Sequence, residues 1–335
     1  MRGFGIFLVV SALVAGIVGC GGGDGNNGGD SYTLIVDFTD GGTVTVDDVP
    51  IPGKAILPCD AGAVVNLNAT PSAGYRFVEW TGNVSSVADA NVASTTVTMG
   101  GDYSITANFA QGVVVAFADP NLEVAIREVI GKPIGEIYEC DLLGLTSLDT
   151  TQRNIMNLGG LEHCTSLTEL YLWDNQISDI STLANLTSLA NLNLWGNYVS
   201  DISTLAGLTS LTYLTLDNND ISDISTLAGL TSLAYLFLPH NQISDISPLS
   251  NLTGLLQLDL TGNQIIDISS LANLTSLEFL VLERNQIIDI LALVDNEGLS
   301  EWDWVLLTDN PLSSDSVNIY IPQLEARGVT VTLHH

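Results

Sequence analysis

The sequence predicts an α/β solenoid that follows a small all-β module, and three observations lead to this fold class. Six consecutive segments repeat one pattern every 22 residues, starting at Leu167, Leu189, Leu211, Leu233, Leu255 and Leu277. A fixed period of this length is typical of a solenoid, in which each unit buries its apolar side against its neighbours. Short alternating strands precede the repeats, and one helical pattern stands between the two regions.

Residues 1–19 are expected to be an export signal. Arg2 supplies a positive charge, and the apolar run 4–18 is too short to span a membrane. The run ends in Ile-Val-Gly-Cys at 17–20. This ending resembles the lipobox of bacterial lipoproteins, which implies cleavage before Cys20, lipidation of Cys20 and attachment to a membrane. An ordinary secretory signal with a chance cysteine is the alternative. The Gly-rich segment 20–31 is predicted to be a flexible tether.

Residues 32–110 are predicted to be the all-β module. Apolar and polar residues alternate at 32–38, 43–46, 63–67, 75–77 and 104–109, with turn residues between them. The run 67–82 contains A-x-P-x-x-G-Y-x-F-x-x-W-x-G, which resembles the internalin B-type bacterial repeat. The resemblance implies a compact β-grasp-like domain, with Phe77 and Trp80 in its core rather than on a ligand-binding surface.

Residues 113–144 are predicted to form a helical cap over the first coil of the solenoid. Asp119 followed by Pro120 is a favoured start of a helix, and Gly131 is a favoured stop. A degenerate unit then begins at Leu145. The segment 299–335 breaks the repeat and is expected to be the C-terminal cap. Cys140 and Cys164 could meet on adjacent coils as a disulfide, or Cys164 could serve as a small buried hydrophobe.

Residues 145–298 resemble leucine-rich repeats of the 22-residue internalin type. Each full unit carries Leu at its first, fourth, sixth and seventeenth places, Asn at the ninth and Asp-Ile at the thirteenth and fourteenth. The resemblance implies one short parallel strand per unit, lining a concave face. We expect the apolar places to point inward and the six Asn to form a buried ladder. The Asp series is expected to cap helical turns, with a calcium-binding row as the alternative.

The places on the concave side that the repeat leaves free carry the candidate site. We expect the second, third, fifth, seventh and eighth places of each unit to face solvent. Aromatic side chains recur at the third, fifth and seventh places, and Tyr and Trp are favoured in recognition surfaces. Ordinary cross-strand pairing is the alternative. The candidate ligand-binding residues are Tyr171, Trp173, Trp195, Tyr213, Tyr235, Phe237 and Phe279, with Glu169, Asp217 and Glu283 as a polar rim.

Charge and composition narrow the function. Asp and Glu number 38 against 8 Lys and Arg, a net charge of −30, which argues against binding nucleic acid. No catalytic arrangement, metal-binding motif or cofactor-binding fingerprint stands out, so we expect no enzyme activity, metal or cofactor. The sequence therefore predicts a binding protein on the cell surface or outer membrane whose partner is an extracellular protein with a basic patch. A polysaccharide ligand and a purely structural envelope role are the alternatives.

Overall fold

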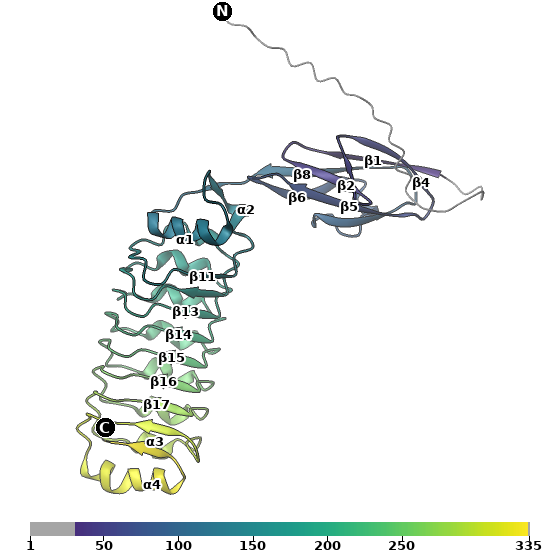
Figure 1. The fold of residues 1–335 in the computed structure, drawn as a ribbon. Helices are drawn as coiled ribbons and strands as arrows, with labels where there is room; N and C mark the ends of the chain where they lie inside the picture. The colour runs from purple at the N-terminus through teal and green to yellow at the C-terminus, as the bar shows by residue number, and fades with distance from the viewer. Residues whose placement is uncertain (1–30, 334–335) are drawn as a thin grey trace, which may run out of the picture. The chain divides into compact units, whose positions relative to one another are not determined.

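The computed structural model describes residues 31–333, which form two compact units divided after Val113. Figure 1 shows a β-rich N-terminal unit and a stacked C-terminal unit. The predicted export signal, Cys20 and nearly all of the predicted tether lie outside the described residues. None of the described helices is long and apolar enough to cross a membrane.

The N-terminal unit consists of two four-stranded sheets around one core. One sheet has the order β4-β1-β8-β6 and the other β3-β2-β5-β7. The strands are β1 (Ser31–Phe38), β2 (Gly42–Val46), β3 (Val49–Ile51), β4 (Ala55–Asp60), β5 (Val64–Pro71), β6 (Tyr75–Gly82), β7 (Ser94–Thr98) and β8 (Tyr103–Gln111). The only helical element within 31–113 is a 3₁₀ turn at Val84–Ser86. The all-β prediction is confirmed, but the β-grasp-like expectation is wrong, because two sheets enclose one core and no α-helix packs on either within 31–113.

Trp80 anchors the core of this unit, as the sequence predicts. Its indole is buried, and its Nε1–H donates to the Val92 carbonyl at 3.0 Å. Phe77 packs against it with ring centroids 5.7 Å apart, and Phe109 lies 6.2 Å from Phe77. A buried aromatic with its polar atom satisfied contributes to packing, so these rings are structural.

The C-terminal unit begins with the predicted helical cap. Helix α1 (Pro120–Ile130) starts at Asp119, whose carboxylate accepts from the backbone N–H groups of Asn121 and Leu122. The helix ends at Gly131, which adopts a left-handed conformation with φ 66°. The strands β9 (Val114–Val115) and β10 (Ile137–Tyr138) pair beside it, and α2 (Glu139–Leu142) follows. Leu122 and Ile126 join the solenoid core, so α1 covers its open end.

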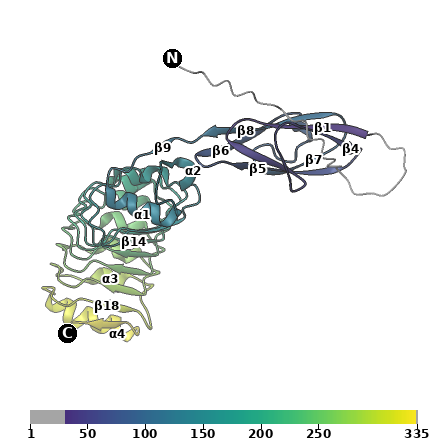
Figure 2. The same ribbon diagram turned by 45° about the horizontal axis from the view of Figure 1, so that its top comes forward.

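Nine short parallel strands form one continuous sheet in chain order. They are β11 (Ser147–Asp149), β12 (Glu169–Tyr171), β13 (Asn191–Asn193), β14 (Tyr213–Thr215), β15 (Tyr235–Phe237), β16 (Gln257–Asp259), β17 (Phe279–Val281), β18 (Trp304–Leu306) and β19 (Thr330–Thr332). From β12 to β17 each residue pairs with the residue 22 positions later. Figures 1 and 2 show these strands stacked along one side of the unit.

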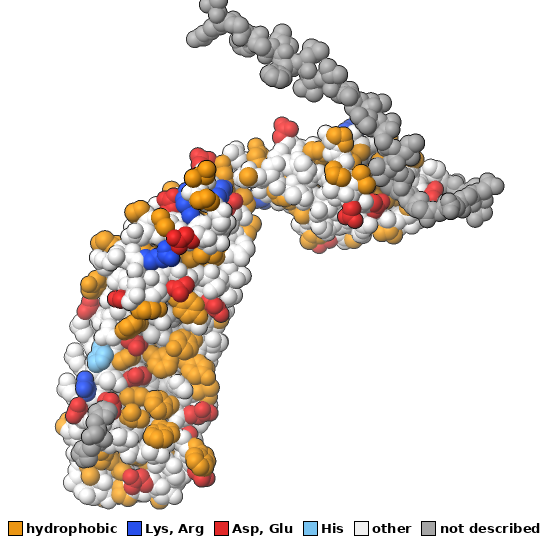
Figure 3. Space-filling view, viewed as in Figure 1, with side chains coloured by type: hydrophobic (Ala, Val, Ile, Leu, Met, Phe, Trp, Pro, Cys, Tyr) orange, Lys and Arg blue, Asp and Glu red, His pale blue; other side chains and the backbone are white. Residues whose placement is uncertain are grey.

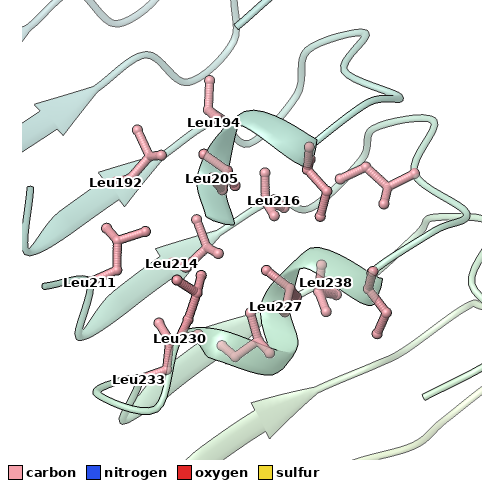
Figure 4. Packing of buried hydrophobic residues seen from close by; sticks show 14 of the residues in the cluster. Leu192, Leu194, Leu205, Leu211, Leu214, Leu216, Leu227, Leu230, Leu233 and Leu238 are labelled. Atoms are coloured by element: carbon pink, nitrogen blue, oxygen red, sulfur yellow. The ribbon is translucent and has the colours of Figure 1, made fainter. Parts of the chain in front are cut away.

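Short 3₁₀ helices lie on the opposite side and close each coil. They span Leu161–His163, Ser181–Asn185, Ser203–Gly207, Ser225–Gly229, Ser247–Asn251 and Ser269–Asn273. The leucines of strands and helices meet between the two sides (Figure 4). All the predicted inward places of the six full units are at most 2% exposed. Each such side chain stabilises the fold by about 1.5–3 kcal/mol, which confirms the predicted core.

The predicted asparagine ladder is present and links each unit to the one before it. The Nδ2 of Asn219 donates to the carbonyls of Leu194 and Leu216, and its Oδ1 accepts from the N–H of Val199. The same bridging recurs at Asn175, Asn197, Asn241, Asn263 and Asn285. Asn310 extends it into the C-terminal cap. The buried amides therefore satisfy backbone groups that the turns leave unpaired.

The Asp series lies at the start of the helices, as predicted, but one residue before the N-cap position, which an Ile holds. The carboxylates of Asp179, Asp201, Asp223, Asp245 and Asp267 each accept the backbone N–H of a Ser two residues on, at 2.8 Å. Asp289 caps the N–H of Leu291 in the same way, at 2.7 Å. Hydrogen bonds from backbone and hydroxyl of Ser203 lower the pKa of Asp201, and the neighbouring serines act alike on Asp179, Asp223 and Asp245. Each acid therefore has a local structural role.

The sixth full unit carries α3 (Leu291–Asp295) where the earlier units have a 3₁₀ helix, and the C-terminal cap comprises the π-helical turn Ser316–Tyr320, α4 (Ile321–Ala326) and the last two strands. Ile321 and Leu324 of this cap join the solenoid core. Cys140 and Cys164 are both free thiols. Burial raises the pKa of Cys164 to about 12, as expected for a small hydrophobe in the core.

Candidate functional site

The candidate site lies on the outer surface of the nine-stranded sheet, here named the strand face. It consists of the third, fifth and seventh places of the six full units, and it is the side that the sequence predicts to be concave. Successive residues of a strand point to opposite sides, so these three places share one surface while the fourth and sixth enter the core. Figure 3 shows hydrophobic side chains gathered with acidic ones over this stretch of strands.

Aromatic rings at equal places of adjacent units lie against one another, as the repeat predicts. Trp173 and Trp195 stand at the seventh place of consecutive units, and their ring centroids are 5.2 Å apart at an interplanar angle of 33°. Tyr213 and Tyr235 at the third place are 5.8 Å apart. Phe237 joins the second pair, at 5.5 Å from Tyr213. The strand spacing therefore builds two aromatic clusters from five of the predicted residues.

The remaining candidates lie at either end of these clusters. Tyr171 accepts a hydrogen bond from Asn191 Nδ2 at 3.3 Å. Burial, with the nearby charge of Glu169, raises the pKa of Tyr171. Phe279 is separated from Tyr235 by Gln257, which pairs with both. The structure thus gathers the central aromatics and leaves Phe279 with the C-terminal cap.

The strand face is less exposed than the sequence suggests. Of the seven aromatic candidates, Trp195 is the most exposed, with 38% of its surface accessible to solvent. The other six are half-buried, and so are Asp217 and Glu283. We expected these places to face solvent. They are only partly exposed, because side chains one strand apart cover each other. Only Glu169 is exposed as a rim residue should be.

Asp217 has the most unusual surroundings on the strand face. Its Oδ1 is buried and has no hydrogen-bond partner among the described residues. Burial, together with the negative charge of Asp259, raises the pKa of Asp217 to about 7. At neutral pH the carboxyl group is therefore divided between its protonated and ionised forms. The sequence shows Asp217 as one of many acids and carries no sign of this shift.

Trp304 is a strand-face residue that the sequence analysis assigned to the cap. On β18 it pairs in register with Phe279 of β17, and 47% of its surface is exposed. Asn310 continues the ladder and therefore holds the ninth place of its coil. Trp304 lies six residues earlier, so it holds the third place. The irregular spacing after Gly298 hides this register in the sequence.

In the turn after each strand, the residue at the eighth place adopts a left-handed backbone conformation. Asp174, Gly196, Asn218, His240, Gly262 and Arg284 all have φ between 52° and 66°. Arg284 lies 3.5 Å from Asp309 as an ion pair. Within the described residues no three His, Cys, Asp or Glu side chains are placed to hold one metal ion. The site is thus a surface of rings, amides and carboxylates.

Comparison with known proteins agrees with both units. Residues 32–113 match the family model of the divergent InlB B-repeat domain. Residues 165–207 and 231–273 match a model of two leucine-rich repeats, and 187–243 match a further leucine-rich repeat model. None of these models describes a catalytic family. The search of curated protein sequences gave no match.

Two solved structures are similar to the chain. An internalin C2 from Listeria monocytogenes is 34% identical, with a TM-score of 0.58, over 67% of this chain and 100% of that one. An internalin (inlF) from the same strain is 31% identical, with a TM-score of 0.53, over 64% of this chain and 68% of that one. Fold and repeat pattern define a leucine-rich repeat protein. The chain belongs to the internalin family of such proteins.

Proposed function

We propose that this protein is an exported, lipid-anchored binding protein that recognises another protein through its strand face. The observation that carries the proposal is the pair of aromatic clusters, Trp173 with Trp195 and Tyr213 with Tyr235 and Phe237. The fold does not require these aromatic residues, because it is already explained by the inward Leu, the Asn ladder and the Asp series. Half-buried Tyr and Trp lose little side-chain entropy on binding and bury much area, which suits a protein interface.

Charge defines the chemistry of the proposed partner. The chain carries a net charge of −30, and no Lys or Arg occupies the third, fifth or seventh place of any full unit. A surface of this sign attracts a basic partner and speeds its encounter at low ionic strength. The partner is therefore a protein with a basic patch next to apolar side chains.

A polysaccharide is the second candidate, and the Trp173–Trp195 pair favours it. Their ring centroids are 5.2 Å apart at an interplanar angle of 33°, so the two indoles pack against each other as one aromatic surface. The flat face of a sugar ring would stack on such a surface. Binding of a neutral sugar would change little with salt, whereas binding of a basic protein would weaken as salt is added.

A pull-down with the purified protein tests the proposal. The panel contains extracellular proteins and polysaccharides, and the variant changes Trp173, Trp195, Tyr213 and Tyr235 to Ala. We expect capture by the wild type and at least a tenfold loss in the variant, because truncating central anchors costs more than about 1 kcal/mol each. The captured species distinguishes protein from polysaccharide.

Two controls separate binding from folding. Tyr198→Ala removes an exposed aromatic side chain at the tenth place, off the strand face, and should retain capture. The circular dichroism melt of the fourfold variant shows whether it folds, and single Trp195→Ala serves if it does not. Equal capture by wild type and folded variant would refute the strand-face site and favour the structural role.

The lipid anchor is tested at Cys20. Acyl chains would hold the protein on the membrane through many buried methylenes, each contributing about 0.8 kcal/mol. Cys20→Ser should therefore move the protein from the membrane fraction to the soluble fraction and abolish labelling by a palmitate analogue. A variant that stays membrane-bound would contradict the anchor.

A further inference from the structure

The repeat does not require an acid at the place that Asp217 occupies. The seventh places of the units beginning at Leu167, Leu189, Leu233 and Leu255 hold Trp173, Trp195, Pro239 and Thr261. All four are uncharged, and all four units keep the same strand and turn. Asp217 also carries no ladder or capping bond of the kind that Asn219 and Asp223 make in the same unit. The carboxylate accepts from its own backbone N–H, and its Oδ1 has no partner among the described residues.

Two oxygen atoms at this position lack a hydrogen bond. Asp217 Oδ1 and Thr215 Oγ1 are both buried and unpartnered in the part of the chain that the structure describes. Thr215 ends β14 and Asp217 follows it two residues later, at the fifth and seventh places that share the strand face. By contrast, Asp259 Oδ1 accepts from the Thr261 N–H at 2.9 Å and from the Thr261 hydroxyl at 2.6 Å. A buried acceptor without a donor is unfavourable, so a donor supplied by a ligand would stabilise it.

Aromatic residues hold the matching places in the neighbouring units. Trp195 holds the seventh place in the preceding unit, and the Gly196 N–H donates to the Asp217 carbonyl at 2.9 Å, which joins the two turns. Phe237 pairs with Thr215 in register on the next strand. A carboxylate beside an exposed indole suits a cation, which interacts with the charge and with the face of the ring.

No cation of the chain itself occupies this position. Every ion pair among the described residues lies elsewhere, at Arg127, Lys132, Arg153, His163 or Arg284. The titratable groups of the surrounding strands and turns are Asp259 on β16, Tyr213 on β14, Tyr235 on β15, and Asp174 and His240 in neighbouring turns. Asp259 is the one whose charge acts on Asp217.

We propose that Asp217, Thr215 and Trp195 form a binding site for one Lys or Arg side chain of the partner protein. We call this the cation site. Asp217 accepts the charged donor, Thr215 accepts a second N–H, and the Trp195 ring packs on the cationic group. The proposal rests on the proposed function, since it names the anchor residue that a basic partner brings to the strand face.

A positive charge fits this position better than a neutral hydroxyl group. A sugar hydroxyl could satisfy Asp217 Oδ1 but would leave the repulsion between Asp217 and Asp259 unchanged. A Lys or Arg side chain supplies donors and offsets both negative charges. A metal ion would require further oxygen ligands, and the described residues hold no group of three acidic, His or Cys side chains for one.

The test uses three short peptides of the form acetyl-Gly-X-Gly-amide, where X is Lys, Arg or the neutral acetyl-lysine. The carboxyl resonance of Asp217 is followed by carbon NMR between pH 4 and 9, with and without peptide. We expect the Lys and Arg peptides to lower the apparent pKa of Asp217 by about one unit, a tenfold preference for its ionised form. The acetyl-lysine peptide should leave it unchanged.

Variants give the second readout, which is the change in tryptophan fluorescence when the Lys peptide is added. Asp217→Asn should weaken peptide binding at least tenfold at pH 8. Asp220→Asn is the matched control, because it removes the same charge from an exposed position in the same unit and should bind like the wild type. Equal weakening in both variants would show general attraction to an acidic protein and overturn the cation site.

Three other outcomes would also overturn the proposal. They are an equal response to charged and neutral peptides, unchanged binding by Asp217→Asn, and a larger shift in the apparent pKa of Asp217 with 1 mM Ca²⁺ alone than with peptide.

Failure of the cation site remains distinguishable from failure of the proposed function. If Asp217→Asn captures the partner as well as wild type while the fourfold aromatic variant does not, only the cation site fails. If neither captures less than wild type, the strand face itself is not the binding surface.

Discussion

At the scale of single residues, the Asn ladder shows how one side chain can set the repeat. Asn219 makes hydrogen bonds to Leu194, Leu216 and Val199, which belong to two successive units. No other side chain of this size offers both a donor pair and an acceptor. A shorter or apolar residue would leave three buried backbone groups without partners.

Asn219→Ala should therefore lower the free energy of unfolding by about 3 kcal/mol, from buried groups worth about 1–3 kcal/mol each. Gln264→Ala, at an exposed tenth place, should change it by less than about 0.5 kcal/mol. Urea denaturation followed by circular dichroism measures both. A loss below about 1 kcal/mol for Asn219→Ala would show that water replaces the ladder bonds.

Asp217 should destabilise the free protein as pH rises. Its pKa is about 7 in the folded chain and about 3.9 when unfolded. Between these values the folded chain binds a proton that the unfolded chain has lost, so stability falls from about pH 4 to pH 7. Asp217→Asn should remove this dependence and be more stable than wild type by about 2 kcal/mol at pH 8, after allowance for partial solvent exposure.

Thermal melts of Asp217→Asn and wild type across this pH range measure the difference. The two proteins should match near pH 4, where the carboxyl is protonated in both states. Asp220→Asn should follow the wild-type curve throughout. A wild-type advantage at pH 8 would mean that the ionised carboxylate has a stabilising partner after all. A residue that costs stability in the free protein is expected where binding is the selected property.

At the scale of elements, Asp119 ties the capping helix to the first coil. Its Oδ1 begins α1 through Asn121 and Leu122, and its Oδ2 accepts from the N–H groups of Met156 and Asn157. Burial acts to raise the pKa of Asp119, but these four backbone bonds outweigh it and lower the pKa. The contribution of Asp119 is thus present above the unfolded pKa and is lost as pH falls through the folded value. Acid should therefore loosen this end of the solenoid.

The strands also decide which aromatics meet. Each strand is three residues long and adds one row to the sheet. Residues at equal places consequently stand one strand spacing apart, which brings Trp173 to Trp195 and Tyr213 to Tyr235. A shift of one residue in this register would send the rings into the core and the leucines into solvent.

At the scale of the whole C-terminal unit, each coil contacts only its neighbours. We expect such an array to tolerate the deletion of a complete unit, because the Asn ladder and the sheet then stay in register. Deletion of part of a unit shifts that register. Deletion of residues 211–232 should therefore leave a protein with a cooperative melt and an unchanged circular dichroism spectrum per residue.

Deletion of residues 211–221 is the matched control, since it removes half a unit. That variant should lose its cooperative melt, because Leu positions of the remaining half-unit no longer align with the core. Equal melts for the two deletions would contradict the nearest-neighbour picture of stability. The 22-residue deletion also removes Asp217 and Tyr213, so it should lose the proposed binding while remaining folded.

The sequence by itself determined the repeat architecture of this protein. Period, inward Leu, ladder Asn and capping Asp are local rules that recur in every unit, so spacing alone places them. The same spacing put Trp173 beside Trp195. The N-cap at Asp119 was equally readable, because a cap depends on a few adjacent residues.

Only the tertiary structure decided how much each strand-face residue is covered and what surrounds it. The half-burial of Asp217, its unpartnered Oδ1 and the nearby charge of Asp259 depend on three strands at once. Trp304 joined the strand face because the cap resumes the register at Asn310. The burial of a side chain and the charge around it depend on all its neighbours, including those from other units. The repeat pattern specifies only the neighbours that are the same in every unit.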